Sequence, residues 1–329
     1  GDGQLTAETA MLLLDAKELY RKWYQDILDS QGAETGHIPH TAPFLGGGGG
    51  PGGWGCAVYQ VPLAWAKIYG DDSLLVQGYD AILRWFDYMD AHSEKGLVVR
   101  EEEGGWCLGD WCFPVSEEKE QLPEAFINTF YYLHGLQEMM QISEKMNNKL
   151  PIRFSEREKN VKTAFLDAYF DPETGDFCEG RAAGNAYGLA LGLGDERTKK
   201  HLVEKYEALG RFDTGIFGTP MLLEQLFSIG AGDLAVRLLT NDSEEASFAH
   251  MKQNGATTLW ERWDGKESHN HPMFGACVRL LFTEILGIRM TPSAQPPVVN
   301  PAQPDVTAQP AQALKPINEI GRASCRERV

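Results

Sequence analysis

Apolar residues three or four positions apart recur along most of the chain, and this spacing constrains the fold more than any other feature. It is typical of amphipathic helices and occurs in ten segments: residues 5–28, 57–69, 74–89, 124–146, 156–169, 185–193, 196–209, 220–229, 232–239 and 272–286. Windows with the two-residue period of a strand are scarce, and runs of β-branched residues are few. The pattern therefore predicts an all-α body.

The connections between these segments are of two kinds. Some are short turns, such as residues 70–72 and 230–232, which place consecutive helices side by side and antiparallel. Others are long and rich in glycine and tryptophan, at residues 31–53, 96–122, 171–184 and 241–270. Long loops in a compact domain are usually functional. In a toroid of helical hairpins we expect them to emerge at one end and surround a substrate cleft.

The charge of the chain limits its partners. There are 47 acidic and 30 basic residues, a formal net charge of −17. Nucleic-acid binding needs concentrated lysine and arginine, so we expect no nucleic-acid partner. The sequence has no apolar stretch of the roughly 20 residues that span a bilayer, so we also expect no membrane partner. We predict a soluble protein with a neutral partner.

Cysteine spacing predicts neither disulfides nor a metal site. The six cysteines are scattered through a chain too long to need a disulfide framework, so we interpret them as thiols. Cys107 and Cys112 form the one close pair and lack partners at zinc-site spacing, so we predict no metal. Signatures of esterases, nucleotide enzymes and zinc proteases are missing from the sequence, which leaves carbohydrate chemistry.

A carboxylate between two indoles is the sharpest candidate site. Glu261 lies between Trp260 and Trp263 in the last long loop. Sugar rings present flat C–H faces that pack on aromatic planes, and glycoside hydrolysis needs carboxylates. The segment therefore combines aromatic surface that could bind a sugar with a carboxylate that could take part in its hydrolysis. An equally balanced interpretation is a surface loop in which the indoles are core anchors and Glu261 pairs with Arg262 or another cation.

Five further residues are candidates for sugar binding. Trp54 and Trp111 are flanked by glycines or by a Gly-Asp pair, which let the backbone approach a ligand, and Trp106 is a weaker candidate. Asp110 could accept a hydroxyl hydrogen bond or instead cap a helix N-terminus, and Trp54 could cap the helix that follows it. His271, ten residues after Glu261, could bind a hydroxyl or tune a carboxylate, or simply begin a helix.

A series of short motifs resembles the catalytic domain of bacterial α-L-rhamnosidases, glycoside hydrolase family 78. The resemblance covers residues 1–288 and consists of these pieces in order: Gly-Asp-Gly-Gln at the start, Ile38-Pro39, Gly53-Trp54-Gly55, Tyr69-Gly70-Asp71, Gly109-Asp110-Trp111, Thr214-Gly215, the segment around Trp260-Glu261-Arg262-Trp263, and Asn270-His271. It implies an (α/α)6 barrel of six helical hairpins.

The resemblance also implies roles for individual residues. Glu261 matches the general base of an inverting mechanism, in which water enters between two carboxyl groups about 6.5–9.5 Å apart. Trp54, Trp111 and His271 match residues that line the pocket for terminal rhamnose, and Asp2 matches an aspartate that hydrogen-bonds sugar hydroxyls. No metal or organic cofactor is implied. The expected partner is a rhamnosylated glycan or glycoside.

The resemblance also predicts departures from the family pattern. The family's general acid lies a few residues before the position of Asp2, so we expect this chain to lack it, to have an incomplete barrel at its N-terminus and to be inactive alone. We expect residues 1–287 to form the catalytic barrel. Residues 288–316 would be a proline-rich linker or a stub of a C-terminal β-sandwich, and residues 317–329 a non-native tail.

Two rival functions remain open at this stage. One is another all-α barrel glycosidase, trehalase-like or fucosidase-like, which would share the tryptophan-rich loops and cleave a different sugar. The other is a non-catalytic carbohydrate-binding pseudoenzyme.

Overall fold

The computed structural model describes residues 1–288, with the exception of residues 47, 103, 106, 115–118, 146–150 and 244. These residues belong to one compact unit, Gly1–Ser293, and a second unit comprises Ala294–Val329. Trp106, the linker from residue 289 onward and the 317–329 tail therefore lie outside the described residues. The helices of the described segments are each too short or too polar to cross a membrane.

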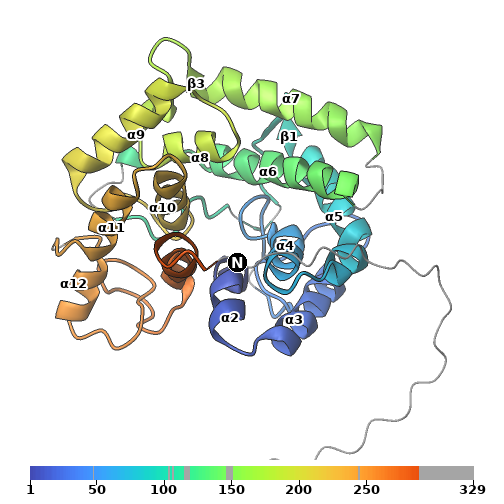
Figure 1. Cartoon of the computed structure of the whole chain (residues 1–329). Helices are drawn as coiled ribbons and strands as arrows, with labels where there is room; N and C mark the ends of the chain where they lie inside the picture. The colour runs from blue at the N-terminus through green and yellow to red at the C-terminus, as the bar shows by residue number, and fades with distance from the viewer. Residues whose placement is uncertain are drawn as a thin grey trace, which may run out of the picture. The chain divides into compact units, whose positions relative to one another are not determined.

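Helices follow one another around a ring in two layers (Figure 1). The inner layer consists of α2 (Ala7–Leu13), α4 (Ala57–Tyr69), α6 (Glu124–Lys145), α8 (Gly184–Ala190) and α10 (Gly218–Ser228). The outer layer consists of α3 (Lys17–Ser30), α5 (Ser73–Ala91), α7 (Ile152–Tyr169), α9 (Glu196–Leu209) and α11 (Gly232–Thr240). This arrangement confirms the predicted helical barrel.

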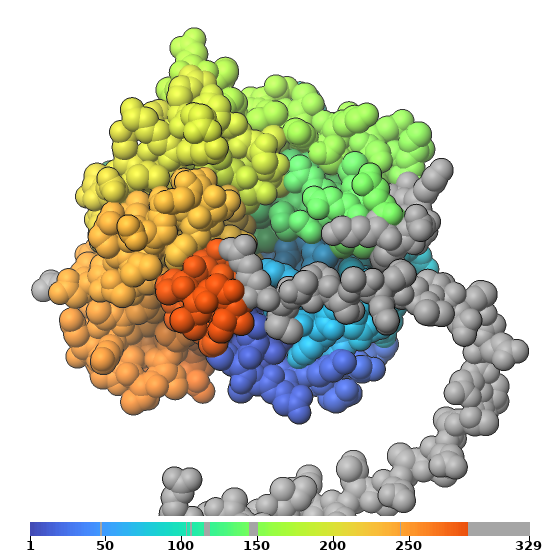
Figure 2. All heavy atoms as spheres, in the orientation of Figure 1, coloured from blue at the N-terminus to red at the C-terminus, as the bar shows by residue number. Residues whose placement is uncertain are grey.

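The ring closes where the N-terminal helices meet the last described segment. That segment runs through η3 (Met273–Cys277), α13 (Val278–Leu280) and the π-turn η4 (Leu281–Ile285). Helix α2 packs against both α4 and this segment. In Figure 2 the blue N-terminal segment accordingly lies beside the orange C-terminal one. Residues at opposite ends of the sequence thus become neighbours.

The inner and outer helices differ in how much of their surface is buried. Helix α4 buries most of its circumference, including Tyr59, Val61 and Trp65, as expected of an inner helix, and leaves Lys67 exposed. Helix α9 buries Thr198, Leu202 and Tyr206 on one stripe and exposes the rest. Its start is fixed by a capping box, in which the Asp195 carboxylate accepts from the Arg197 and Thr198 amides. The core is thus shared between the two layers.

The predicted helix over residues 5–28 is wrong. The structure has three helices there, α1 (Asp2–Leu5), α2 and α3, with an extended residue at Leu14 between the last two. Leu13 and Leu14 are 50% and 66% exposed, so the apolar run across this break is not a continuous buried stripe. Residues 272–286 are likewise split into the 3₁₀, α and π turns of the last segment.

The remaining elements are short and lie in the connections. Two-residue strands form two antiparallel hairpins, β1 (Ser93–Glu94) with β2 (Leu97–Val98), and β3 (Phe170–Asp171) with β4 (Asp176–Phe177). A 3₁₀ turn, η2 (Cys178–Gly180), follows β4. Helix α12 (Phe248–Gln253) lies inside the loop predicted over residues 241–270. All five described cysteines are free thiols, as expected.

Candidate active site

Glu261 is held by the loop that contains it and by one indole from a distant loop. Its backbone N–H donates to Ser268 O at 2.8 Å, and its Oε2 accepts from Ser268 N at 3.3 Å. The Trp111 indole N–H lies 3.5 Å from Oε1. The Glu261 side chain is 18% exposed, so the carboxylate is fixed on several sides and still open to a small molecule.

His271 joins Glu261 to Asp2. Its Nδ1 lies 3.3 Å from Glu261 Oε2, and its Nε2 lies 3.0 Å from Asp2 Oδ2. The His271 backbone N–H donates to Leu259 O at 2.9 Å, which fixes the ring relative to the Glu261 loop. The two carboxylates therefore flank one imidazole, and both of its nitrogens can donate together only when the ring carries two protons.

Asp110 is buried and holds the Trp111 loop in place through backbone hydrogen bonds. It is 3% exposed, and its carboxylate accepts the backbone N–H groups of Gly215, Phe217 and Gly218 at 2.7–2.9 Å. These amides form the N-terminus of α10, where a carboxylate is stabilised by unpaired donors and the helix dipole. Burial nevertheless raises the pKa of Asp110 to about 6. Its oxygens are buried and occupied, so the structure supports the alternative, helix capping, and contact with substrate stays a prediction.

A close backbone crossing explains the Thr214-Gly215 motif. The Ile216 N–H donates to Trp111 O at 2.9 Å, so the two loops run against each other. A Cβ on Gly215 would lie 2.1 Å from Trp111 O, a distance that no side chain tolerates. Glycine is thus required for the approach that presents Trp111 to Glu261.

Trp260 and Trp263 are core anchors in the structure, as in the alternative interpretation of this segment, and their contact with sugar stays a prediction. They are 5% and 3% exposed. Trp263 stacks on Phe212 with ring centroids 5.5 Å apart and donates its indole N–H to Thr214 O at 2.8 Å. Trp260 stacks on His269 at 4.5 Å. The two indoles pin the loop on both sides of Glu261 and so leave the carboxylate at its surface.

Trp54 lies beside the N-terminal residues and is partly buried. Its ring packs edge-on against Phe217 with centroids 4.7 Å apart. A Cβ on Gly1 would lie 2.2 Å from Trp54 Nε1, so Gly1 touches the indole directly and Asp2 follows one residue on. The Gln4 side-chain amide donates to Gly53 O, which ties α1 to the Trp54 loop. Trp54 thus contacts the segment that carries Asp2.

Three supporting residues were missed from the sequence. Ser268 holds the Glu261 loop, Phe217 supports Trp54, and Gln4 ties the N-terminal helix to the Trp54 loop. Gln4 and Phe217 lie within or beside recognised motifs, but their role depends on contacts across the ring. Arg262 pairs with Asp264 at 3.3 Å and not with Glu261, whose basic neighbour is His271.

A cluster of possible metal ligands lies in the 96–122 loop and its junction with α6. Cys107 meets Glu101 and Glu124, whose ligand atoms all lie within 4.8 Å of one another. Both glutamates are exposed, and exposed carboxylates commonly cluster without an ion. Cys107 Sγ also accepts from the Asn128 side chain at 3.0 Å. We assign no metal to this cluster.

Comparison with known proteins places the chain in a family. Residues 1–285 match the bacterial alpha-L-rhamnosidase 6 hairpin glycosidase domain. An alpha-L-rhamnosidase of Formosa agariphila is 30% identical over 88% of this chain and 33% of its own length. One from Streptomyces avermitilis is 28% identical over 88% of this chain and 28% of its own length.

Solved structures agree with the sequence relatives. The crystal structure of Streptomyces avermitilis alpha-L-rhamnosidase complexed with L-rhamnose is similar with a TM-score of 0.77 at 27% identity, over 87% of this chain and 28% of that one. The alpha-L-rhamnosidase structure from Dictyoglumus thermophilum has a TM-score of 0.75 at 26% identity, over 86% and 33%.

The fold and the comparisons together define a six-hairpin glycosidase domain. The chain belongs to the bacterial alpha-L-rhamnosidase family and is homologous to the catalytic domain of those enzymes. It spans about a third of the length of the relatives it matches.

Proposed function

We propose that this domain hydrolyses terminal α-L-rhamnosides with inversion, and that Glu261 is the general base. The observation that carries the proposal is the chain of contacts from Trp111 through Glu261 and His271 to Asp2. A carboxylate that is held by donors and remains partly open can accept a proton from water as that water attacks the anomeric carbon.

The other residues of this cluster have distinct roles in the proposal. Trp111, 36% exposed, offers its ring to the apolar face of the sugar and its N–H to Glu261. Asp2, 44% exposed, accepts hydrogen bonds from sugar hydroxyls. His271 fixes the positions of the two carboxylates relative to each other and can itself donate to a hydroxyl. Trp54 forms part of the pocket wall beside Asp2.

Protonation of the leaving oxygen needs a second carboxyl group. Among the described residues, Asp2 is the one other carboxylate that contacts Glu261 or His271. We assign Asp2 to hydroxyl binding, so the acid belongs to a group outside this cluster. This assignment is tested by leaving-group dependence, as argued at the end of the Discussion.

Replacing Glu261 tests the general base directly. In the protein encoded by the complete gene, Glu261→Gln keeps the side-chain shape and can still accept from Trp111, but it cannot take a proton from water. We expect kcat to fall about 10²–10⁴-fold while substrate binding changes little. With the wild-type protein, proton NMR of the first product formed should show the anomer of inverted configuration.

A matched control is Glu267→Gln, six residues away in the same loop and exposed. It should leave kcat within about twofold of wild type, since it removes a charge from the loop and no contact to Glu261. Activity of Glu261→Gln within about threefold of wild type would place the base elsewhere. Binding of rhamnose without any turnover by the complete protein would favour a non-catalytic role.

A further inference from the structure

A second cavity of about 600 Å³ opens inside the ring, away from the Glu261 cluster. Its described lining comes mainly from α4, α6 and α10, with further residues from α1, α2, α5, η3 and α13, and Asp72 lies at the short turn between α4 and α5. Trp111, Glu261 and His271 are not among these lining residues. The volume is within the roughly 300–1,000 Å³ of pockets that hold small molecules.

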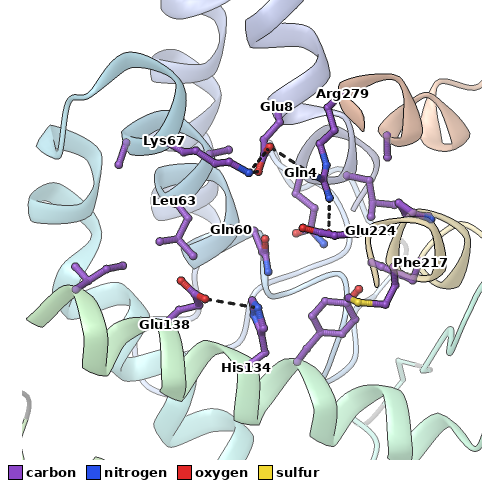
Figure 3. Close-up of a pocket in the computed structure, with 18 of the residues that line it drawn as sticks. Gln4, Glu8, Gln60, Leu63, Lys67, His134, Glu138, Phe217, Glu224 and Arg279 are labelled. Carbon is purple, nitrogen blue, oxygen red and sulfur yellow. Dashed lines mark hydrogen bonds and ion pairs between the residues drawn. The ribbon is translucent and has the colours of Figure 1, made fainter. Parts of the chain in front are cut away.

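Two ion pairs between different helices and a histidine–glutamate contact within α6 face this cavity (Figure 3). Lys67 lies 2.8 Å from Glu8, Arg279 lies 2.6 Å from Glu224, and the His134 ring lies 3.8 Å from Glu138. Glu224 belongs to an inner helix, yet its side chain is 43% exposed. An inner-helix carboxylate can reach water to this extent only because the ring is hollow beside it.

The inner end of the cavity is a wall shared with the pocket around Trp54. Gln4 and Phe217 line the cavity, and on their other side they contact Gly53 O and the Trp54 ring. Gln4 is 7% exposed, and its side-chain oxygen has no hydrogen-bond partner among the described residues. A buried amide oxygen without a partner is costly, and a donor from a bound molecule would satisfy it after a small shift of the side chain.

We propose that this cavity is a second saccharide site, which binds a neutral mono- or disaccharide at the end of the barrel opposite the catalytic cluster. Each ion pair places a hydrogen-bond donor beside an acceptor, an arrangement that matches the neighbouring hydroxyls of a sugar. The rings of Phe130, Tyr131 and Phe217 add apolar surface for its C–H faces. This proposal goes beyond hydrolysis at Glu261 and does not depend on it.

The charges of the lining favour a neutral ligand over an ionic one. Carboxylates from Glu8, Asp72, Glu138 and Glu224 outnumber the cations of Lys67 and Arg279, which disfavours phosphates and uronates. Glu8 and Glu224 already have cationic partners within the lining, Lys67 and Arg279, so a ligand need not bring a positive charge to them. Hydroxyl groups can therefore bind without separating these pairs.

Two variants separate this site from the catalytic pocket. Met221→Trp places an indole in the cavity from α10, and Gln225→Trp adds the same bulk to α10 at a side chain that is not among the lining residues. Glu224→Gln weakens the Arg279 pair, and Glu207→Gln makes the same change in a surface pair with Arg237. Circular dichroism shows whether each variant retains the helical fold.

Binding is measured by ligand-observed NMR with L-rhamnose and D-glucose, in a Trp111→Ala background that weakens the catalytic pocket. We expect saturable binding of at least one sugar that Met221→Trp and Glu224→Gln each weaken about tenfold or more, and that the two control variants change by less than about twofold. The proposal is overturned if neither sugar binds in the Trp111→Ala background, or if the cavity variants leave binding unchanged. Displacement by inorganic phosphate or spermidine in place of either sugar overturns it as well.

Discussion

At the scale of single residues, the candidate site depends on which tryptophans reach the surface. Trp111 is 36% exposed and donates toward Glu261, whereas Trp260 and Trp263 are at most 5% exposed and hold the loop from below. The indoles nearest to Glu261 in sequence are therefore its supports. The indole that can meet a sugar comes from a loop 150 residues away.

Trp111→Ala should weaken substrate binding more than it slows the chemical step. An aromatic platform contributes about 0.5–1.5 kcal/mol beyond simple burial, so we expect KM to rise roughly three- to tenfold. Trp111→Phe keeps the ring and removes the N–H that faces Glu261, and it should recover most of the lost binding. Steady-state kinetics on both variants provide the measurement; an unchanged KM with a large fall in kcat would assign Trp111 to the chemistry instead.

The sequence predicted which residues form the candidate site better than it predicted which of them are buried. Glu261, Trp111, His271 and Asp2 were all singled out, and the structure brings them into one cluster. The sequence left the burial of Trp263 open, because the stack on Phe212 that buries it joins residues about 50 positions apart. A Trp-Glu-x-Trp pattern shows that an indole is near a carboxylate, but not which side of the loop faces the core.

At the scale of elements, the start of α10 organises the Trp111 loop through Asp110. One carboxylate accepts three amide N–H groups of the helix terminus, while the carbonyl of the next residue accepts from Ile216. The helix start and the substrate loop therefore form one unit. The sequence left capping and substrate binding open for Asp110, since both use the same residue type.

The raised pKa of Asp110 predicts how stability depends on pH. With a pKa of about 6 in the folded chain and 3.8 as its ordinary value, the folded chain binds this proton more tightly than the unfolded chain. The contribution of Asp110 to stability is thus full below pH 3.8 and is lost as the pH rises through about 6. The loss should amount to about 1–3 kcal/mol.

The measurement is the free energy of unfolding of wild type minus that of Asp110→Asn, followed from pH 4 to pH 7.5. This difference removes the titration of all other groups, and it should decrease with rising pH and then level off. A difference that grows with pH would mean that the three amide donors outweigh burial and hold the pKa of Asp110 below its ordinary value.

Element boundaries were the weaker part of the sequence prediction. The break at Leu14 carries neither glycine nor proline, and the helical spacing of apolar residues continues across it. Periodicity reports which residues could share a face, but it does not report where the chain turns. Only the packing of α2 inside the ring and α3 outside it fixes that boundary.

At the scale of the whole molecule, closure of the ring assembles the site. Asp2 and His271 are 269 residues apart in the sequence and 3.0 Å apart in space, because α2 packs against the last described segment. The ring also encloses the second cavity, whose ion pairs join helices from both ends of the sequence. The resemblance to rhamnosidases predicted a six-hairpin barrel that is incomplete at its N-terminus, and it did not predict that α2 packs against the last described segment.

The leaving group of the substrate should reveal where the acid resides. Because Asp2 is assigned to sugar hydroxyls, the group that protonates the leaving oxygen lies outside the cluster around Glu261. An alkyl rhamnoside needs that proton, whereas a nitrophenyl rhamnoside releases a stable phenolate without it, and general acid catalysis contributes about 10²–10⁴-fold. A residue that supplies this proton is therefore recognised by a variant that slows alkyl rhamnosides at least about 10²-fold and nitrophenyl rhamnoside much less. In the complete protein, Asp2→Asn should slow both substrates by the same factor, as loss of a hydroxyl contact would. An Asp2→Asn defect confined to the alkyl substrate would instead identify Asp2 as the acid.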